Sequence, residues 1–449
     1  MSRKKLYYPV LFLCCLSSVS PAQEKNFPAQ ISIMYPMGTH GQQSINYAYN
    51  LSVNLLTGKV GGVKGIGVSG LYERVENSVY GIQVAGFANI VGGQVKGIQT
   101  SGVVNIVNGG TIGIQTSGLA NIVNNGMKGM QTSGVVSIAN VGMQGIQTSG
   151  IVNLVNNEMK GIQISGVANL VNGETKGIQA SAFTNIAYGE MTGIQASCFN
   201  LVNGEMKGIH ISGIANLVNG GMKGIQVSGI ANLVSEEMRG IQIAGVGNGF
   251  ANMTGLQIGG IFNRVHTLRG LQIGLVSITD TIAKGISLSL VNIVKRGFYK
   301  EWELSFSDYA NVALSYKMGM QKFYTIYTAG INIIEDNLWI VGIGFGNRTP
   351  IGNRFDFQPE LVSCNYYPTN FKNIQTTLVT RLKFGFAYRL NEKYGLLLSP
   401  SVYVMTAKKD TNSNSEFYKI SPLGSLYTNE GDNRQTTIGA GISLGLSIR

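Results

Sequence analysis

Hydrophobic and polar positions recur with a fixed short period between residues 65 and 297. A typical unit is MKGIQISGVANLVNGE, residues 159–174, in which Gln follows the opening Gly of GIQ by two places and Asn follows it by eight. Fifteen such glycines are spaced 15 or 16 residues apart: Gly65, Gly81, Gly97, Gly113, Gly129, Gly145, Gly161, Gly177, Gly193, Gly208, Gly224, Gly240, Gly255, Gly270 and Gly285. A short period of this kind is the signature of a repeat architecture, in which each unit stacks on its neighbour.

Each unit reads as two β-strands joined by a corner. In the unit above, GIQIS forms the first strand, Gly166 the corner, VANLV the second strand and NGEMK the return turn. No proline lies between Pro36 and Pro350, as expected of continuous β-structure, because proline cannot donate to a strand ladder. We therefore expect an all-β chain with a parallel β-solenoid of about 15 coils, whose identical slots stack about 4.8 Å apart in a rod on the order of 70 Å long.

The two sides of each coil are assigned by hydropathy. We expect the apolar side chains of the unit to fill the interior: Met159, Ile162, Ile164, Ala168 and Leu170. The polar slots then lie on the outer face, where stacked Gln and Asn side chains bond along the ladder. The candidate contact surface consists of these slots and their neighbouring valines: Gln163, Val167, Asn169 and Val171.

A second interpretation treats GIQISGVANLV as one strand of eleven residues. The NG that follows is a strong hairpin signal, so fifteen strands would form one wide antiparallel barrel whose polar face lines a pore. An up-and-down sheet has two unlike ends and needs turns of two alternating types. The successive turns VNGGTIG, VNNGMKG and VNNEMKG show no such alternation, and the units have few of the aromatic residues that form the girdles of membrane barrels. The pattern therefore favours the solenoid.

The pattern changes from about residue 298, where the period is lost and aromatic residues become frequent. In TTLVTRLKFGFAYRL an apolar row alternates with a row of charged or small residues, which is typical of a membrane-spanning β-strand. This run, the last run of the chain and six others make eight strands, enough for a small closed barrel; the six begin near Trp302, Val312, Phe323, Leu338, Phe355 and Tyr394. The alternative is an antiparallel sandwich with one buried face, but runs such as GAGISLGLSI carry no charge on either side.

The N-terminus reads as a secretory signal peptide over residues 1–22. Three basic residues precede the apolar run Leu11–Leu16, and Ser20 and Ala22 place small residues before the cleavage point. The remaining chain divides into a leader at 23–64, the repeats at 65–297 and a C-terminal antiparallel domain at 298–449. The net charge of +12 falls to 12 − 3 = +9 without the signal and is spread along the chain, so we expect no nucleic-acid partner.

Candidate chemistry is sparse. His210 occupies the Gln slot of its unit, and we expect it to replace a ladder Gln. Cys198 fills a slot held elsewhere by Gly or Ala and reads as a small packed residue. Glutamates recur two residues before the basic slot, where the neighbouring Lys row offsets their charge on a solvated edge: Glu158, Glu174, Glu190 and Glu205. No nucleophile–base order, CxxC or catalytic carboxylate pair stands out, so we expect no enzymatic activity, cofactor or metal.

The leader PMGTHGQQSINYAYNLSVNLLTGKVGGVKG, residues 36–65, is followed by serial GIQ–SG–N–V units. This combination resembles the bacterial surface-repeat proteins, a family of exported cell-envelope proteins, over roughly residues 30–300. The resemblance implies export and a setting at the cell surface or outer membrane, and it supplies no catalytic residues.

Pattern and resemblance together predict a structural or binding protein. The C-terminal domain is expected to contact outer-membrane lipid, and the repeats to present an extended surface to a polymer or protein ligand, because repetition suits multivalent contact. An outer-membrane pore or transporter is the alternative function, and it belongs to the wide-barrel interpretation.

Overall fold

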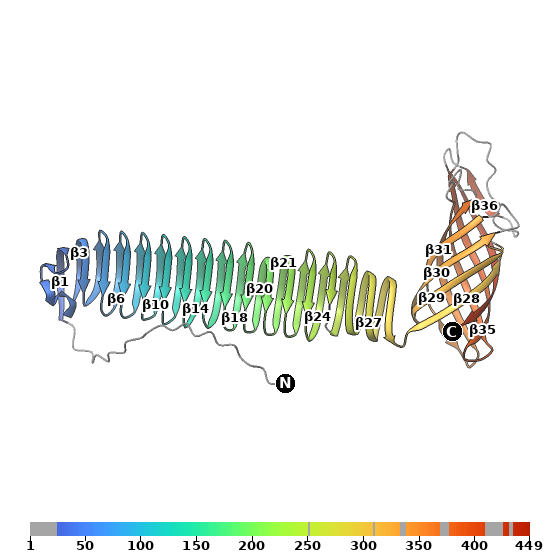
Figure 1. Ribbon diagram of the computed structural model, residues 1–449, viewed down its shortest axis with the longest axis horizontal. Coiled ribbons are helices and arrows are strands. Elements are labelled where there is room, and N and C mark those ends of the chain that lie inside the picture. The colour runs from blue at the N-terminus through green and yellow to red at the C-terminus, as the bar shows by residue number, and fades with distance from the viewer. Residues whose placement is uncertain are drawn as a thin grey trace. The chain divides into compact units, whose positions relative to one another are not determined.

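The computed structural model describes residues 25–249, 252–308, 310–332, 338–368, 377–408, 425–430 and 434–449. The predicted signal peptide, residues 1–22, lies outside this set. The chain is all-β, with a parallel β-solenoid of about 14 turns and a closed C-terminal antiparallel barrel of eight strands (Figure 1). The predicted fold class is therefore confirmed, and the alternative of one wide antiparallel barrel is wrong, because the coils pair in parallel. The chain forms two compact units, residues 1–156 and residues 157–449.

The first described strands form the start of the solenoid. β1 (Lys25–Met34) pairs in parallel with β3 (Tyr47–Val60) and antiparallel with β2 (Met37–Gly38), and the 3-10 helix η1 (Gly41–Asn46) precedes β3. Pro28 lies in β1, and the short β2 hairpin covers part of the same strand. Both features discourage further pairing at a sheet edge.

Each following coil of the first unit has a long strand and a short strand. The long strands are β4 (Gly62–Ser69), β6 (Val79–Ala85), β8 (Val95–Ser101), β10 (Thr111–Ser117), β12 (Met127–Ser133) and β14 (Gly142–Ser149). The short strands are β5 (Tyr72–Val75), β7 (Ala88–Val91), β9 (Val104–Val107), β11 (Ala120–Val123), β13 (Val136–Ala139) and β15 (Val152–Val155). Long strands pair with long strands and short with short, so that Gln99, Gln115 and Gln131 are direct neighbours.

The coils of the second unit continue this plan. The long strands are β16 (Glu158–Ser165), β18 (Thr175–Ser181), β22 (Met222–Ser228), β24 (Glu237–Ala244) and β26 (Asn252–Gly259). The short strands are β17 (Ala168–Val171), β19 (Thr184–Ala187), β23 (Ala231–Val234) and β25 (Gly247–Gly249). Three strands are continuous around the corner: β20 (Met191–Val202), β21 (Met206–Val218) and β27 (Phe262–Arg296). In β20, whose unit is one residue short, the register shifts between Ser197 and Phe199, so the residue is missing from the corner.

Apolar and amide columns together fill the coil interior. In the second unit the buried apolar side chains form one cluster through successive coils: Ala187, Met191, Val202, Met206, Val218, Met222, Val234, Met238, Met253, Val265 and Leu268. The Gln and Asn slots beside them are fully buried as well. Because strand residues alternate sides, Met159 inside the coil requires Gln163 and Ser165 to be inside too.

The predicted assignment of the coil interior is wrong for four of its five residues. Met159 lies inside, as predicted. The others lie on the outer side, where Ile164 is 46% exposed and the remaining three are half-buried: Ile162, Ala168 and Leu170. The physical reason is that a buried amide costs little when each of its polar atoms has a partner, and in-register stacking provides one in the next coil.

The opening glycine of each unit is required by the stacking of coils. Gly113 has a φ of +139°, and a Cβ built there would lie 1.9 Å from the carbonyl oxygen of Gly97 in the preceding coil. The same positive φ recurs at the opening glycines from Gly81 to Gly285. A side chain at this slot would push two adjacent coils apart.

The C-terminal barrel closes by pairing its first strand with its last. Its eight strands are β28 (Tyr299–Ser307), β29 (Val312–Met320), β30 (Phe323–Asn332), β31 (Leu338–Gly346), β33 (Phe355–Pro368), β34 (Thr377–Arg389), β35 (Tyr394–Lys408) and β37 (Arg434–Ile448). β28 joins β37 through the pair Trp302 and Ile448. The short β32 (Thr349–Ile351) and β36 (Ser425–Glu430) pair with β33 and β37.

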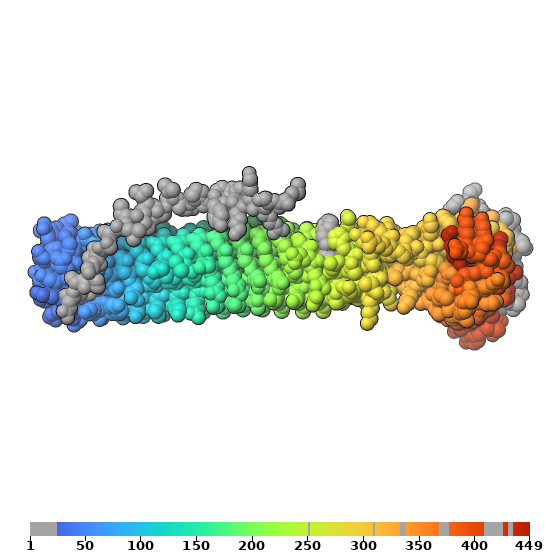
Figure 2. All heavy atoms as spheres, turned by 90° about the horizontal axis from the view of Figure 1, so that it is seen from below, coloured from blue at the N-terminus to red at the C-terminus, as the bar shows by residue number. Residues whose placement is uncertain are grey.

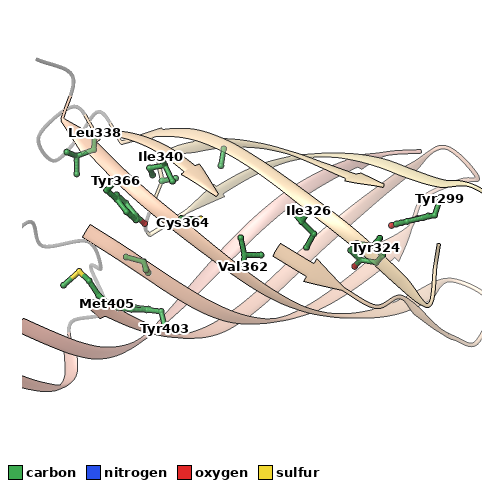
Figure 3. Packing of buried hydrophobic residues seen from close by; sticks show 13 residues of the cluster. Tyr299, Tyr324, Ile326, Leu338, Ile340, Val362, Cys364, Tyr366, Tyr403 and Met405 are labelled. Carbon is green, nitrogen blue, oxygen red and sulfur yellow. The ribbon is translucent and has the colours of Figure 1, made fainter. Parts of the chain in front are cut away.

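Residues of the barrel strands alternate between interior and exterior. In β34, Arg381 and Lys383 are buried, whereas Leu378 and Leu382 are exposed on the outside. Buried aromatic and aliphatic side chains, among them Tyr324, fill part of the interior (Figure 3). The prediction of an apolar outer row over a polar inner row is confirmed for this strand. Among the helices in the described residues, none is long and apolar enough to cross a membrane.

We expect Gly113→Ala to destabilise the first unit, because its Cβ would overlap the Gly97 carbonyl oxygen and alanine disfavours a positive φ. The free energy of unfolding should fall by roughly 3 kcal/mol or more. Gly110→Ala is the matched control, since the heavy atom nearest to a Cβ there is 3.3 Å away. Urea unfolding followed by far-ultraviolet circular dichroism measures both, and equal losses would contradict the stacking argument.

Candidate functional site

Most of the residues that were predicted to form the contact surface lie in the coil interior. Gln163, Asn169 and Val171 are fully buried, so the prediction that they form an outer surface is wrong. Val167 lies on the outside at the corner and is 42% exposed. The predicted ladders do exist, but they stabilise the coils from within and offer nothing to a ligand.

The interior ladders connect amide groups of successive coils. The Nε2 of Gln99 donates to Oε1 of Gln83 at 3.0 Å, and Gln115 donates to Gln99 in the same way at 2.8 Å. The Asn slot also bonds to the backbone: Asn105 Nδ2 lies 2.9 Å from Asn121 Oδ1 and 2.7 Å from the carbonyl oxygen of Thr116. The Asn ladder therefore holds the short strand of one coil against the long strand of the next.

The outer side of the coils is strongly apolar. The slot after the opening glycine forms an exposed column in the first unit, each member 36–45% exposed: Ile66, Ile82, Ile98, Ile114, Met130 and Ile146. A second exposed column follows the corner and includes Leu71, Phe87, Leu119 and Ile151. Figure 2 shows the coils within each unit in direct contact, so these columns form continuous surfaces.

Charge distinguishes the two units. In the second unit Glu and Lys or Arg pair two residues apart on the outer edge, with 2.9 Å between Glu158 and Lys160 and 2.8 Å between Glu237 and Arg239. The basic groups are exposed and the two glutamates are half-buried, so the edge is solvated as predicted. Between Asn77 and Asn156 the first unit has two charged residues, Lys96 and Lys128.

His210 interrupts the Gln ladder. It is fully buried in the Gln slot, as predicted, and its Nδ1 lies 3.5 Å from Gln226 Nε2. Neither His210 Nε2 nor Gln195 Oε1 has a hydrogen-bond partner. Burial lowers the pKa of His210 to about 3, so the ring is neutral at pH 7. In the regular ladder this slot makes two Gln–Gln hydrogen bonds, one to each neighbouring coil. With His210 in the slot, only the 3.5 Å contact to Gln226 remains.

Glu73 places a buried carboxyl group in the Asn slot of the second coil. Ser52 Oγ and Asn54 Nδ2 donate to its Oε1 at 2.8 and 3.1 Å, and Gln83 Nε2 donates to its Oε2 at 3.2 Å. Gly67 stands in the Gln slot, and a Cβ there would lie 2.6 Å from Oε2, so the glycine leaves room for the carboxyl group. Burial raises the pKa of Glu73 to about 7, against the opposing effect of these hydrogen bonds.

The barrel interior contains a network of buried ion pairs. Lys317 Nζ lies 2.6 Å from Glu303, 2.5 Å from Glu360 and 3.4 Å from Glu301. Lys383 joins the same acids, at 3.2 Å from both Glu303 and Glu360. Each ammonium group therefore has carboxylate partners, as a buried charge requires.

A second group of charges lies around Asp356 in the same barrel. Arg348 and Arg449 approach its carboxylate to 2.6 and 3.2 Å, and Arg449 also contacts Glu301 at 2.8 Å. The guanidinium of Arg381 lies over the ring of Tyr403 at 5.0 Å from the centroid. An eight-stranded barrel has an interior just wide enough to be filled by side chains, and here paired charges and aromatic rings fill it.

The alternation of residues in β34 predicts that its charged row lies inside the barrel, but it does not predict the partners of those charges. Glu301 faces Lys317, and Glu360 faces Lys383, as directly opposed cross-strand pairs. Opposite charges at facing positions of two predicted antiparallel strands are the signal that identifies such pairs. Cys198 and Cys364 are both free thiols, and the described residues hold no cluster of metal-binding side chains.

The exterior of the barrel is apolar and carries aromatic rings near its ends. At one end, cross-strand neighbours form ring pairs: Trp302 with Tyr316, Phe323 with Phe345, Phe355 with Tyr388 and Phe357 with Phe386. Toward the other end, Trp339 is exposed and faces Tyr367 across the ladder. The outward side chains between the ends are mainly aliphatic: Leu304, Leu314, Val341, Leu361, Leu382, Leu398, Val402 and Leu444.

Comparison with known proteins finds no matching family model, no matching curated protein and no matching solved structure.

We expect His210→Gln to complete the ladder and to raise the free energy of unfolding at pH 7.5 by about 1–2 kcal/mol. The substitution should also remove an acid sensitivity. The folded-state pKa of His210, about 3, lies below its unfolded value of 6.5. The unfolded chain therefore binds the extra proton between these values, and His210 lowers stability as pH falls, by about 2 kcal/mol at pH 5. Urea titrations at both pH values test this, and an unchanged pH dependence in the variant would refute it.

Glu73 should have the opposite pH dependence. Its folded-state pKa, about 7, lies above its unfolded value of 4.5. The folded chain holds the extra proton between these values, so Glu73 lowers stability as pH rises from 4.5 to 7, by up to about 3 kcal/mol. Glu73→Gln should remove this slope, measured by urea unfolding of the first unit at pH 5 and 8. Glu76→Gln is the control, at a half-buried carboxylate that pairs with Lys59 and Arg74. A slope that survives in Glu73→Gln would exclude the buried carboxyl group as its source.

Proposed function

We propose that this protein is an exported, outer-membrane-anchored surface protein. Its barrel is embedded in lipid, and its solenoid presents an extended surface for multivalent contact. The observation that carries the proposal is the inverted burial pattern of the barrel. Charged side chains are paired inside it, and the exposed wall between its ends is aliphatic.

The inversion supports lipid as the surrounding medium. A barrel in water gains stability by placing apolar side chains inside and charges outside, because burying a charge requires a paired partner. Here Glu303, Lys317 and Glu360 are buried, while Leu382 and Leu444 are exposed. A hydrocarbon environment removes the cost of the exposed leucines, and the closed strand order leaves no unpaired barrel edge for that environment to meet.

The aromatic residues support the same setting. Membrane barrels carry an apolar band flanked by aromatic girdles at both interfaces with water. The ring pairs that include Trp302 and Phe355 lie at one end of the band, and Trp339 lies toward the other. The predicted signal peptide and the resemblance to surface-repeat proteins are consistent with this proposal.

The solenoid supports a binding or structural role. Its outward slots repeat once per coil, so any contact made by one coil is offered again by the next, and weak contacts add by avidity. A polymer or a protein with its own repeating surface is the partner class that this arrangement suits. The filled barrel interior argues against transport, because paired side chains occupy the space that a solute would need.

The double substitution Leu382→Arg/Leu444→Arg tests the lipid contact. Each arginine near the middle of the apolar band should cost about 2–4 kcal/mol in a membrane. We expect the fraction of full-length protein that fractionates with outer membrane and shows heat-modifiable gel migration to fall at least tenfold.

Ile225→Arg/Ile241→Arg is the matched control, because both residues are exposed on coils of the second unit. This variant should remain in the membrane fraction. Release of the unsubstituted protein by an alkaline or urea wash, or equal retention of both variants, would refute the membrane proposal.

A further inference from the structure

The first unit has a flat apolar face that the proposed membrane anchor does not use. We define the long-strand face as the outward side of β6, β8, β10, β12 and β14. Its central column consists of exposed side chains: Ile82, Ile98, Ile114, Met130 and Ile146. The next outward column is Val84 followed by four threonines: Thr100, Thr116, Thr132 and Thr148. No described acidic residue lies on these five strands.

The equivalent strands of the second unit differ in charge. There, Lys160, Lys176 and Arg239 stand beside glutamates two residues earlier, at 2.8–2.9 Å. On the long-strand face the corresponding edge column alternates between charged and uncharged residues: Tyr80, Lys96, Ile112, Lys128 and Gln144. A row of exposed ion pairs favours water, whereas a nearly uncharged apolar row of this extent marks an interaction surface.

The distance between identical side chains on the long-strand face determines which kind of surface can pack against it. Its strands are parallel and in register, so identical side chains recur at the strand separation of about 4.8 Å. Sheets built from identical stacked segments pair through dry interfaces in which the side chains of one sheet interdigitate with those of the other. A surface with a different repeat distance loses this fit after a few strands, whereas a second copy of this chain keeps it throughout.

We propose that the long-strand face packs against the same face of a second copy of this chain. The two-fold contact is isologous, with each copy contributing the same isoleucine column. Because lysine occupies every second coil, an offset of one coil places Lys96 and Lys128 opposite uncharged residues of the partner. Like charges therefore need not meet across the contact.

The extent of the face is sufficient for a weak dimer. With the offset of one coil, four strands of each copy overlap, and seven residues at about 3.3 Å by four strands at about 4.8 Å give a patch of roughly 23 by 19 Å. Two such patches bury on the order of 900 Å² in total, the size of a weak and reversible contact. The contact is independent of the membrane proposal, because none of its residues belongs to the barrel.

Sedimentation velocity of the detergent-purified full-length protein, across a concentration series, tests the contact. We expect a concentration-dependent dimer that Ile98→Lys/Ile114→Lys weakens at least tenfold. The matched control is Ile225→Lys/Ile241→Lys in the second unit, which changes the same slot at similar exposure, 39% and 36% against 39% and 40%, next to the ion pairs of Glu205 with Lys207 and of Glu237 with Arg239. The control should leave the dimer intact.

Ile98→Thr/Ile114→Thr adds a test without added charge, since threonine already occupies the neighbouring column. It should also weaken the dimer, with a circular dichroism spectrum identical to that of the unsubstituted protein. A monomer at all concentrations would overturn the proposal. So would equal weakening by the control pair, or a dimer that survives both long-strand-face variants. None of these results depends on whether the barrel enters a membrane.

Discussion

In-register stacking of side-chain amides is the interaction on which the solenoid depends. Ladder Gln side chains donate to the Gln of a neighbouring coil, as Gln99 does to Gln83, and ladder Asn side chains bond both to the next Asn and to a backbone carbonyl, as Asn105 does. These bonds form only when equal slots face each other, because a displaced amide would leave buried donors and acceptors without partners. The ladder therefore specifies the register that the apolar columns of Met and Val alone would leave open.

The opening glycine and the corner follow from the same constraint. Stacking at the strand spacing brings Gly113 against the carbonyl oxygen of Gly97, so this slot excludes any side chain. The shortened unit that begins at Gly193 keeps the ladder and loses its residue at the corner, as the shift between Ser197 and Phe199 demonstrates. Glu73 and His210 are tolerated in ladder slots because burial favours the neutral form of each side chain. It raises the pKa of Glu73 and lowers the pKa of His210.

The solenoid and the barrel provide partners for their buried polar groups in different ways. The coils bury neutral amides, whose partners are identical residues one coil away. The barrel buries full charges, and Lys317 needs carboxylates from three other residues, Glu301, Glu303 and Glu360. The amide ladder extends with each added unit, whereas the ion-pair network is confined to one closed interior. This difference is consistent with the proposed roles of the two parts, an extended repeat surface and a single membrane anchor.

The sequence by itself determined the elements. The 16-residue period, the absence of proline and the alternation after residue 298 predicted stacked coils and eight barrel strands, because these patterns are properties of one unit or one strand. It did not determine which side of the coil faces inward, since Gln163 and Ile162 alternate with equal regularity. Only the tertiary structure decided that the amides are inside, because their partners belong to neighbouring coils. The pairing of Glu360 with Lys317 likewise crosses the barrel interior and depends on its closure.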